Sequence, residues 1–348
     1  MKTERKGNGA TTMHDVAREA GVSIKTVSNV INDYPYIRPE TRKRVEDAIA
    51  RLGYHPNLSA RGLRSGRTGV ISLIIPDLRN AYFAELADVV MRAATEQGLS
   101  VIIEQSGGDR ERELDLIHGA RMQAVDGILY SVLGLEEDDA HLLEDVTTPM
   151  VLLGERIFHG PADHVTMQNV EGSRAATEHL ITQGRRRIVA LGAHRGEVIG
   201  SAGLRLSGYR QALDAAGIPF DERLVGEVGG WFRSEGADTM KELLASGVSF
   251  DGVVAFNDSI ALGAMRIMQE AGIRIPDDVA VIGFDDVDET RYTLPTLSTI
   301  DPGKEEIAEV AVRYLRERIA DPDSGIAPRE YLSGFRVVER ESSAPSVP

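Results

Sequence analysis

The most informative side chains lie near the amino terminus, where a short segment carries a lysine, two asparagines and several hydroxyl groups. Within it Val27, Val30 and Ile31 recur at i, i+3 and i+4, the spacing of the buried face of a helix. The other side chains then point outward, where ammonium, amide and hydroxyl groups can reach base edges and phosphate oxygens. The pattern predicts a nucleic-acid contact surface made of Ser23, Ile24, Lys25, Thr26, Ser28, Asn29 and Asn32.

Two further helices are needed to hold that surface in place. Thr12 followed by Asp15 is a capping-box-like start for a helix that ends at Gly21, where a left-handed turn leads to the second helix, capped by Ser23. A third helix is expected from Pro39 to Gly53. The spacing is typical of a DNA-binding helix-turn-helix within a three-helix bundle. The alternative is a helical hairpin packed on another domain.

The charge distribution favours the DNA-binding alternative. Residues 1–67 hold 13 Lys and Arg against 7 Asp and Glu, a net charge of +6, whereas the other 281 residues carry −21. A basic head attracts the phosphate backbone, and an acidic body limits non-specific coating of DNA.

A glycine- and arginine-containing segment, residues 55–68, connects the head to the rest of the chain. It can be a flexible linker, or a short helix that orders on DNA, where arginines such as Arg61 grip phosphates and Leu63 wedges into the minor groove. Gly62 and Gly66 weaken an isolated helix, so the residues alone leave both readings open.

From Val70 onward the sequence alternates between apolar runs and amphipathic stretches. Runs such as 70–76, 99–104, 126–132, 150–155, 188–193, 251–257 and 278–285 predict buried strands, with helices between them and a last long helix from Pro302 toward Asp321. This pattern predicts an α/β body of two similar lobes, each with a parallel sheet of about five or six strands covered by helices. Ligands of such sheets bind at the carboxyl ends of the strands, here in the cleft between the lobes.

Composition excludes several other classes of protein. There is no cysteine for disulfides or thiolate metal sites, and no apolar run of 18 residues for a membrane span. The first ten residues have no apolar core and predict a disordered basic arm rather than a signal peptide, and the tail SSAPSVP is also expected to be disordered. We expect a cytoplasmic protein without membrane contact.

An enzyme and a solute-binding protein are the two alternatives for the body. The nucleotide and zinc-protease motifs G-x-x-x-x-G-K-[ST], G-x-G-x-x-G and H-E-x-x-H do not occur, and only His159 and His164 lie close together, in a loop-like, solvated HGPADH. We therefore expect no catalytic residues, metal or cofactor. A transporter's solute-binding protein would carry a signal peptide and would lack a DNA-reading head. The sequence meets neither condition, so we expect no transport function.

The chain resembles the LacI/GalR family of bacterial transcriptional repressors from Thr12 to about Arg340. The matching motifs are DVAREAGVSIKTVSNVIN, ARGLRSGRT, RLSGYRQAL, FNDSIALGAM and VIGFDD. The resemblance implies a homodimer that binds a partly palindromic operator in double-stranded DNA and takes a small effector, commonly a sugar, in a periplasmic-binding-protein-like core. It also implies that Ile24, Lys25 and Asn29 read bases, and that Leu63 is the hinge leucine inserted into the operator.

The resemblance also implies an effector-binding set in the body. Arg205 matches the family's effector-gripping arginine, Asp285 and Asn257 match polar groups at strand ends, and Trp231 matches an aromatic that stacks on sugars. Gly154 and Gln168 stand where many relatives carry Asp, so Glu155 is the candidate for the missing carboxylate. The expected set is Tyr82, Phe83, Glu155, Ser201, Arg205, Trp231, Asn257 and Asp285.

The expected domain limits follow from these assignments. They are 1–11 for the arm, 12–54 for the helix-turn-helix domain, 55–68 for the hinge, 69–165 with 301–322 for the first effector lobe, 166–300 with 323–341 for the second lobe, and 342–348 for the tail. The tail lacks apolar heptads, which favours a dimer over a tetramer.

Overall fold

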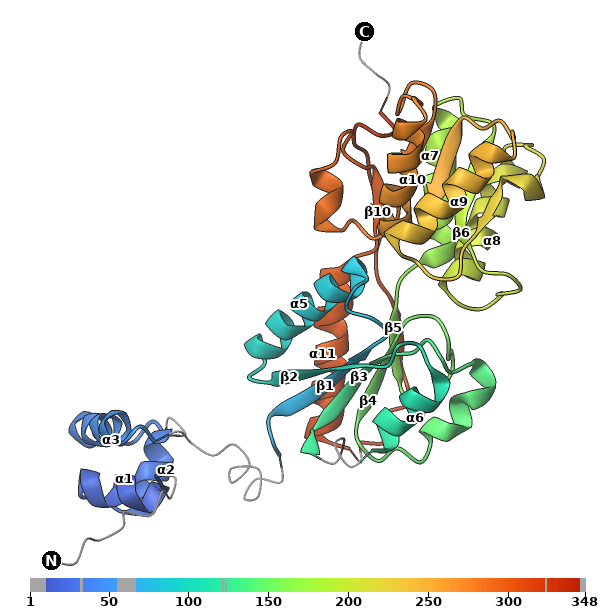
Figure 1. The fold of residues 1–348 in the computed structure, drawn as a ribbon. Coiled ribbons are helices and arrows are strands. Elements are labelled where there is room, and N and C mark those ends of the chain that lie inside the picture. Colours follow the sequence, from blue (N-terminus) through green and yellow to red (C-terminus); the bar gives the residue numbers. More distant parts are fainter. Residues whose placement is uncertain are drawn as a thin grey trace, which may run out of the picture. The chain divides into compact units, whose positions relative to one another are not determined.

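The chain folds into two compact units, Met1–Thr68 and Gly69–Pro348 (Figure 1). The structure is a computed structural model, and it describes residues 11–31, 34–54, 67–119, 122, 124–322 and 324–344. The predictions for Asn32, Arg61 and Leu63, and for most of the arm and the hinge, lie outside the described residues.

The first unit contains the three predicted helices, α1 (Met13–Ala20), α2 (Ile24–Ile31) and α3 (Pro39–Leu52). The capping box at Thr12 is confirmed, because Asp15 N–H donates to the threonine hydroxyl and the Asp15 carboxylate accepts from the Thr12 N–H. Gly21 has the predicted left-handed conformation, with φ of 61°. Small and branched side chains from all three helices fill the core, chiefly Val16, Ala17, Val27, Val30, Val45 and Ala48.

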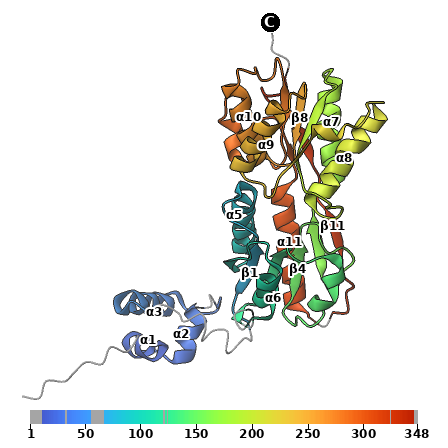
Figure 2. The ribbon, with the colours of Figure 1, turned by 45° about the vertical axis from the view of Figure 1, so that its right-hand side comes forward.

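The second unit consists of two lobes, each built around a parallel sheet (Figure 2). The first sheet has six strands in the order β11-β5-β4-β3-β1-β2, and the second has four in the order β7-β6-β8-β9. The predicted α/β class with parallel sheets is confirmed, although the second sheet is smaller than expected. A separate antiparallel pair, β10–β12, accompanies it.

The elements of the first lobe alternate strand and helix through β4, β5 follows β4 without a helix between them, and two later segments complete the lobe. They are β1 (Val70–Ile75), α5 (Ala81–Glu96), β2 (Ser100–Gln105), α6 (Arg110–His118), β3 (Gly127–Ser131), η2 (Glu137–Leu143), β4 (Met150–Leu153), β5 (Asp163–Thr166), α11 (Lys304–Ala320) and β11 (Glu330–Leu332). Helix α11 packs beside α5 and against the strands β3, β4 and β5.

The second lobe continues the same alternation. Its elements are α7 (Asn169–Thr182), β6 (Ile188–Ala193), α8 (Ser201–Ala215), η3 (Glu222–Leu224), β7 (Val225–Glu227), α9 (Arg233–Ala245), β8 (Gly252–Ala255), α10 (Asp258–Glu270), β9 (Ala280–Ile282), η4 (Asp288–Arg291), β10 (Thr299–Asp301) and β12 (Arg336–Val338). Helices α7 and α8 pack as one pair and α9 and α10 as another.

The chain crosses between the lobes three times, after β5, after β10 and after β11. Strand β11 pairs with β5 in the first sheet, so the expected placement of the whole segment 323–341 in the second lobe is wrong for residues 330–332. The prediction that the tail from residue 342 is disordered is also wrong for its first two residues. Ser342 and Ser343 are buried, and the Ser342 hydroxyl donates to the carbonyl of Val281 at 2.7 Å.

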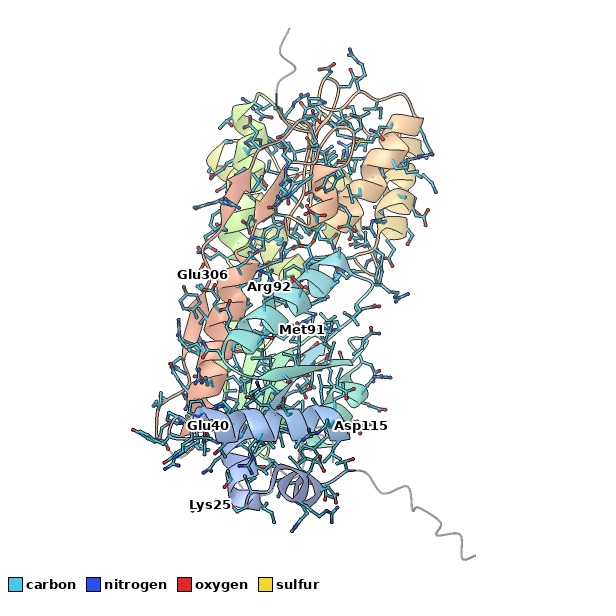
Figure 3. The ribbon with its side chains drawn as sticks, turned by 90° about the vertical axis from the view of Figure 1, so that its left-hand side faces the viewer. Lys25, Glu40, Met91, Arg92, Asp115 and Glu306 are labelled. Carbon is cyan, nitrogen blue, oxygen red and sulfur yellow. The ribbon has the colours of Figure 1, made fainter. Side chains whose placement is uncertain are left out.

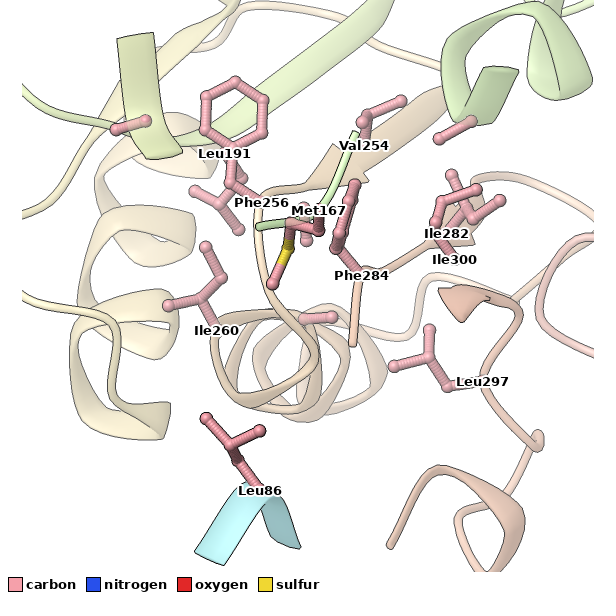
Figure 4. Close-up of a cluster of buried hydrophobic side chains, with 14 of the residues drawn as sticks. Leu86, Met167, Leu191, Val254, Phe256, Ile260, Ile282, Phe284, Leu297 and Ile300 are labelled. Atoms are coloured by element: carbon pink, nitrogen blue, oxygen red, sulfur yellow. The ribbon is translucent and has the colours of Figure 1, made fainter. Parts of the chain in front are cut away.

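The core of the second lobe lies directly under the strand ends that face the first lobe. Phe256, Phe284, Ile260 and Leu297 are buried there, and Leu86 of α5 in the first lobe joins the same apolar cluster (Figure 4). Strands covered on both faces carry continuous apolar runs, which explains why the sequence locates them well.

Candidate functional site

The exposed face of α2 is the first candidate site. Lys25 is exposed there (Figure 3), and Ser28 and Asn29 are half-buried. Ser23 and Thr26 are engaged locally, because the Ser23 hydroxyl accepts the Thr26 N–H at 3.1 Å and lies 2.9 Å from the Thr26 hydroxyl. These bonds cap α2 and fix its first turn. Ile24 packs partly against the apolar core of the unit, so it is less outward than the sequence predicts.

The turn between α1 and α2 is held by the third helix. Arg44 of α3 donates to the carbonyl of Ala20 at 2.6 Å and to that of Gly21 at 3.2 Å. These carbonyls are left without helical partners at the end of α1, and the arginine satisfies them. The contact fixes the direction of α2 relative to α1 and presents Lys25 on a rigid support.

The second candidate site is a pocket between the two lobes of the body. Its atom-free space is about 610 Å³, part of it continuous with solvent. Both lobes contribute side chains at the carboxyl ends of their strands. Seven of the eight predicted effector residues line it, namely Tyr82, Phe83, Glu155, Ser201, Arg205, Trp231 and Asp285.

Arg205 is the central cation of the pocket and is only 2% exposed. Its Nε donates to Asn169 Oδ1 at 2.7 Å, its Nη1 donates to the carbonyl of Phe256, and it lies 3.8 Å from the Asp285 carboxylate. The guanidinium also stacks 3.7 Å from the centre of the Phe284 ring. Burial lowers the pKa of Arg205, and the neighbouring carboxylates oppose that shift. The side chain is therefore held rigidly.

Glu155 follows β4 in the first lobe, and its side chain contacts residues of the second lobe. Its carboxylate accepts from the Ser201 hydroxyl at 2.6 Å and from Asn169 Nδ2 at 2.8 Å. Asn169 Oδ1 also accepts a hydrogen bond from Arg205 Nε, so Ser201, Glu155, Asn169 and Arg205 form one continuous polar network. The predicted carboxylate thus lines the pocket and joins residues of both lobes.

Asp285 and Asp258 form a buried acidic pair behind the network. Burial raises the pKa of Asp285 to about 7, while Arg205 and Lys304 lower it. Burial also raises the pKa of Asp258, and the charge of Asp285 adds to the effect. Lys304, at the start of α11, donates to the carbonyls of Asp285 and Asp286 and pairs with Glu85 at 3.0 Å.

Trp231 and Asn257 have different places in the site. The indole N–H of Trp231 donates to the carbonyl of Gly192 at 2.9 Å, and its ring lies 4.9 Å from the Arg205 guanidinium. Asn257 does not line the pocket. Its side chain caps α10 by accepting the Ile260 N–H at 2.8 Å and donates to the Trp231 carbonyl at 3.2 Å, so both amide atoms are occupied. The structure therefore places it behind the tryptophan.

The sequence analysis missed several polar side chains of the pocket. Asn80 caps α5, Ser131 ends β3 and Thr166 ends β5, and all three line the pocket. Their common signal is their place at or just after the carboxyl end of a strand. Thr166 and Asn80 are not in any motif, so only the topology of the sheet reveals them.

The histidine pair near residue 160 differs from its prediction. His164 is buried in β5, where its Nε2 lies 2.5 Å from the carbonyl of Gly154, whereas the sequence suggests a solvated loop. His159 is exposed and pairs with Glu330 at 2.7 Å. Among the described residues no group of His, Asp and Glu side chains is arranged to hold a metal ion, and no helix is long and apolar enough to span a membrane.

Comparison with known proteins agrees with this architecture at both ends of the chain. A family model described as bacterial regulatory proteins, lacI family, matches residues 12–57, and a periplasmic binding protein-like domain model matches residues 177–343. The transcriptional regulator RegA of Clostridium saccharobutylicum is 31% identical over 96% of this chain and 99% of its own.

Solved structures give the same result. A transcriptional regulator of LacI family from Sanguibacter keddieii DSM 10542 is 51% identical, with a TM-score of 0.74, over 80% of this chain and 99% of that one. The transcriptional regulator CelR, solved as a complex with cellobiose, is 30% identical, with a TM-score of 0.71, over 96% of this chain and 100% of that one. The chain therefore belongs to the LacI family of bacterial regulatory proteins and is a DNA-binding transcriptional regulator.

Proposed function

We propose that this chain is a repressor that binds operator DNA as a homodimer and changes its affinity when a small sugar-like metabolite enters the interlobe pocket. The observation that carries the proposal is the pocket itself, because both lobes line it and a ligand there contacts both at once. A ligand that bridges the lobes favours one closure angle, and the DNA-binding heads sense that angle. Repression relieved by the ligand is the default expectation.

The chemistry of the lining favours a polyhydroxylated, uncharged ligand. Trp231, Tyr82 and Phe83 offer apolar ring faces, while Glu155 and Asp285 can accept hydroxyl hydrogens and Arg205 can donate to ring oxygens. Two carboxylates face one guanidinium, so the pocket offers no excess of positive charge to a phosphate or carboxylate. The cellobiose complex of CelR is a sugar precedent within the family.

On the DNA side, we assign base contacts to Ile24, Lys25 and Asn29. Lys25 can donate to guanine acceptors, and Ile24 can touch a thymine methyl group. We assign Ser23, Thr26 and Ser28 to the sugar-phosphate backbone of the DNA. Asn32, Arg61 and Leu63 complete the proposed contacts from outside the described residues. The exposure of Lys25 on a braced helix supports this assignment.

A fluorescence titration of the full chain tests the effector proposal, because Trp231 is the only tryptophan. Neutral pentoses, hexoses and disaccharides are titrated beside their phosphorylated forms and a set of nucleobases. We expect a saturable change in emission with at least one neutral sugar and a much weaker response with its phosphate. A flat response to every neutral sugar, or a preference for the phosphate, contradicts the proposed ligand class.

The variant Arg205→Lys tests whether the sugar binds in this pocket. Lysine keeps the positive charge but lacks the planar guanidinium that donates to both Asn169 and the Phe256 carbonyl. We expect the variant's affinity for the responding sugar to fall by roughly tenfold or more, the scale of one lost charge-assisted hydrogen bond. Equal affinity in this variant would place the sugar elsewhere.

A further inference from the structure

Glu197 lies in the loop between β6 and α8, and its carboxylate makes contacts in three directions. One oxygen accepts the backbone N–H of Ala202 at 3.1 Å, and the other lies 2.9 Å from His194 Nδ1 and 3.3 Å from Arg156 Nη2. The Glu197 side chain is only 11% exposed. Neither Glu197 nor Arg156 lines the pocket, and the sequence analysis assigns them no role.

The first contact completes helix α8. The residue before the helix is Gly200, which has no side chain to cap the free N–H groups of the first turn. Glu197 supplies the missing acceptor, and its negative charge suits the positive end of the helix. The same first two turns carry Ser201 and Arg205 into the pocket, so the cap fixes the start of the element that presents both side chains.

The second contact joins the two lobes. Arg156 directly follows the pocket residue Glu155 in the first lobe, and besides Glu197 it donates to the carbonyl of Ile199 at 3.3 Å. The Arg156 side chain is 17% exposed, so solvent screens this pair less than a surface ion pair. It lies beside the Glu155–Ser201 hydrogen bond, which also crosses between the lobes.

We propose that Glu197 is a positioning residue of the pocket, which holds the lobes together through Arg156 while it caps the helix that carries Ser201 and Arg205. Formation of the binding surface and closure of the lobes then depend on one side chain. A ligand that needs a different closure angle must break the Arg156–Glu197 pair, so the pair sets how readily occupancy changes the angle. This inference rests on the proposed effector function of the pocket.

The closure part of the proposal is tested without any ligand, by acrylamide quenching of Trp231 in the full chain. Trp231 lines the pocket and its ring lies 5.6 Å from that of His194. In Arg156→Gln and Glu197→Gln we expect the quenching constant to rise by roughly twofold or more, because loss of the pair shifts the lobes toward an open state. The double variant should exceed neither single variant, since both remove the same interaction.

Arg195→Gln is the matched control, because Arg195 lies in the same loop but pairs with Glu227 of its own lobe at 3.0 Å. Its quenching should equal that of the unaltered chain. If the quenching constant of Trp231 in Arg156→Gln and in Glu197→Gln also equals that of the unaltered chain, the closure part of the proposal is overturned. A rise of the quenching constant in Arg195→Gln that equals the rise in the other two variants would overturn it as well.

The capping part is tested by hydrogen exchange of the Ala202 and Gly203 amides. Glu197→Ala removes the acceptor and should speed exchange of these amides roughly fivefold, the scale of a lost helix cap. Arg156→Gln should leave them unchanged, and Glu197→Gln should keep most of the protection because its amide oxygen still accepts. Unchanged exchange in Glu197→Ala would refute the cap. Thermal unfolding of each variant confirms that it is folded.

These two readouts separate this inference from the proposed effector function. Both are made on the ligand-free chain, so they can succeed even if no sugar binds. Conversely, a sugar that binds the unaltered chain and both variants with equal affinity, together with unchanged quenching, would leave the effector function standing and remove the role of Glu197.

Discussion

Asp285 shows how strongly the surroundings of one side chain determine its chemistry. It ends the run that includes β9, its backbone has φ of 116°, and its side chain is 6% exposed beside Arg205 in the lining of the pocket. Few non-glycine residues adopt such a backbone, and strain of this kind is concentrated at functional sites. The neighbouring Lys304 fixes the backbone by binding the carbonyls of Asp285 and Asp286.

The raised pKa of Asp285 predicts a specific dependence of stability on pH. Burial raises the pKa from 3.8 to about 7, so between these values the folded state keeps a proton that the unfolded state has released. Stability from this group is therefore present below about pH 4 and is lost as the pH rises through about 7. In Asp285→Asn, which cannot ionise, the thermal midpoint should fall less between pH 5 and pH 8.

Asp221→Asn is the control for that measurement, because Asp221 is partly exposed and its pKa is lowered by hydrogen bonds from Arg223. Both Asp221 and its variant keep a constant charge between pH 5 and pH 8. Parallel midpoint curves for the unaltered chain and Asp285→Asn would show that Asp285 does not titrate in this range.

At the residue scale, the pocket could be predicted where a motif marks a strand end. Arg205 and Asp285 stand in motifs that the family shares, Trp231 matches an aromatic position of the family outside those motifs, and all three line the pocket. Asn257 stands in such a motif too, but its amide caps α10 instead. An Asn after a strand and before a helix suits both roles, and only the direction of its side chain separates them.

At the scale of elements, the helix pairs of the second lobe owe their close packing to glycines. A Cβ on Gly263 of α10 would lie 1.9 Å from the carbonyl oxygen of Arg233 in α9, and one on Gly208 of α8 would lie 2.1 Å from the carbonyl oxygen of Val170 in α7. The backbones touch at these points. No side chain could be accommodated unless the helices moved apart.

Gly263→Ala should therefore destabilise the second lobe by roughly 1–3 kcal/mol or more, the cost of overpacking a rigid contact. Chemical denaturation followed by circular dichroism measures the loss. Gly229→Ala is the matched control, since its Cβ would meet only a Glu235 carboxylate oxygen at 4.0 Å. Equal stability of the two variants would show that α9 and α10 can separate at little cost.

The elements that the sequence does not reveal are short and polar. Strands β5, β11 and β12 read DHVT, EYL and RVV, and β11 and β12 are largely exposed edge strands. They lack the continuous apolar run that marks a strand covered on both faces. Their places are set by long-range pairing, such as that of Tyr331 with Val165, which no local pattern encodes.

At the scale of the whole molecule, charge separates the two units. Residues 1–67 carry +6 and the remainder carries −21, so attraction to DNA belongs to the first unit and repulsion to the second. Ionic strength should therefore act strongly on operator binding and weakly on binding of an uncharged ligand to the pocket.

We expect operator affinity, measured by fluorescence anisotropy, to fall by roughly a hundredfold or more between about 50 and 200 mM salt, while sugar affinity measured through Trp231 changes little. Lys25→Ala, which removes the proposed donor to guanine, should weaken operator binding by about 1–3 kcal/mol and relax specificity at that base pair. Lys241→Ala, on an exposed α9 position paired with Asp238, is the control. A salt slope near zero would contradict electrostatic binding by the head.

The three crossings between the lobes also bear on the order in which the protein can be completed during synthesis. All four strands of the second sheet lie within residues 188–282, whereas the first sheet needs β11 at residues 330–332 and the covering helix α11. The sheet that begins first on the ribosome is thus the last to be finished. Its early strands must wait for most of the polypeptide to emerge, and the second lobe likewise gains its last strand, β12, only when residues 336–338 have been made.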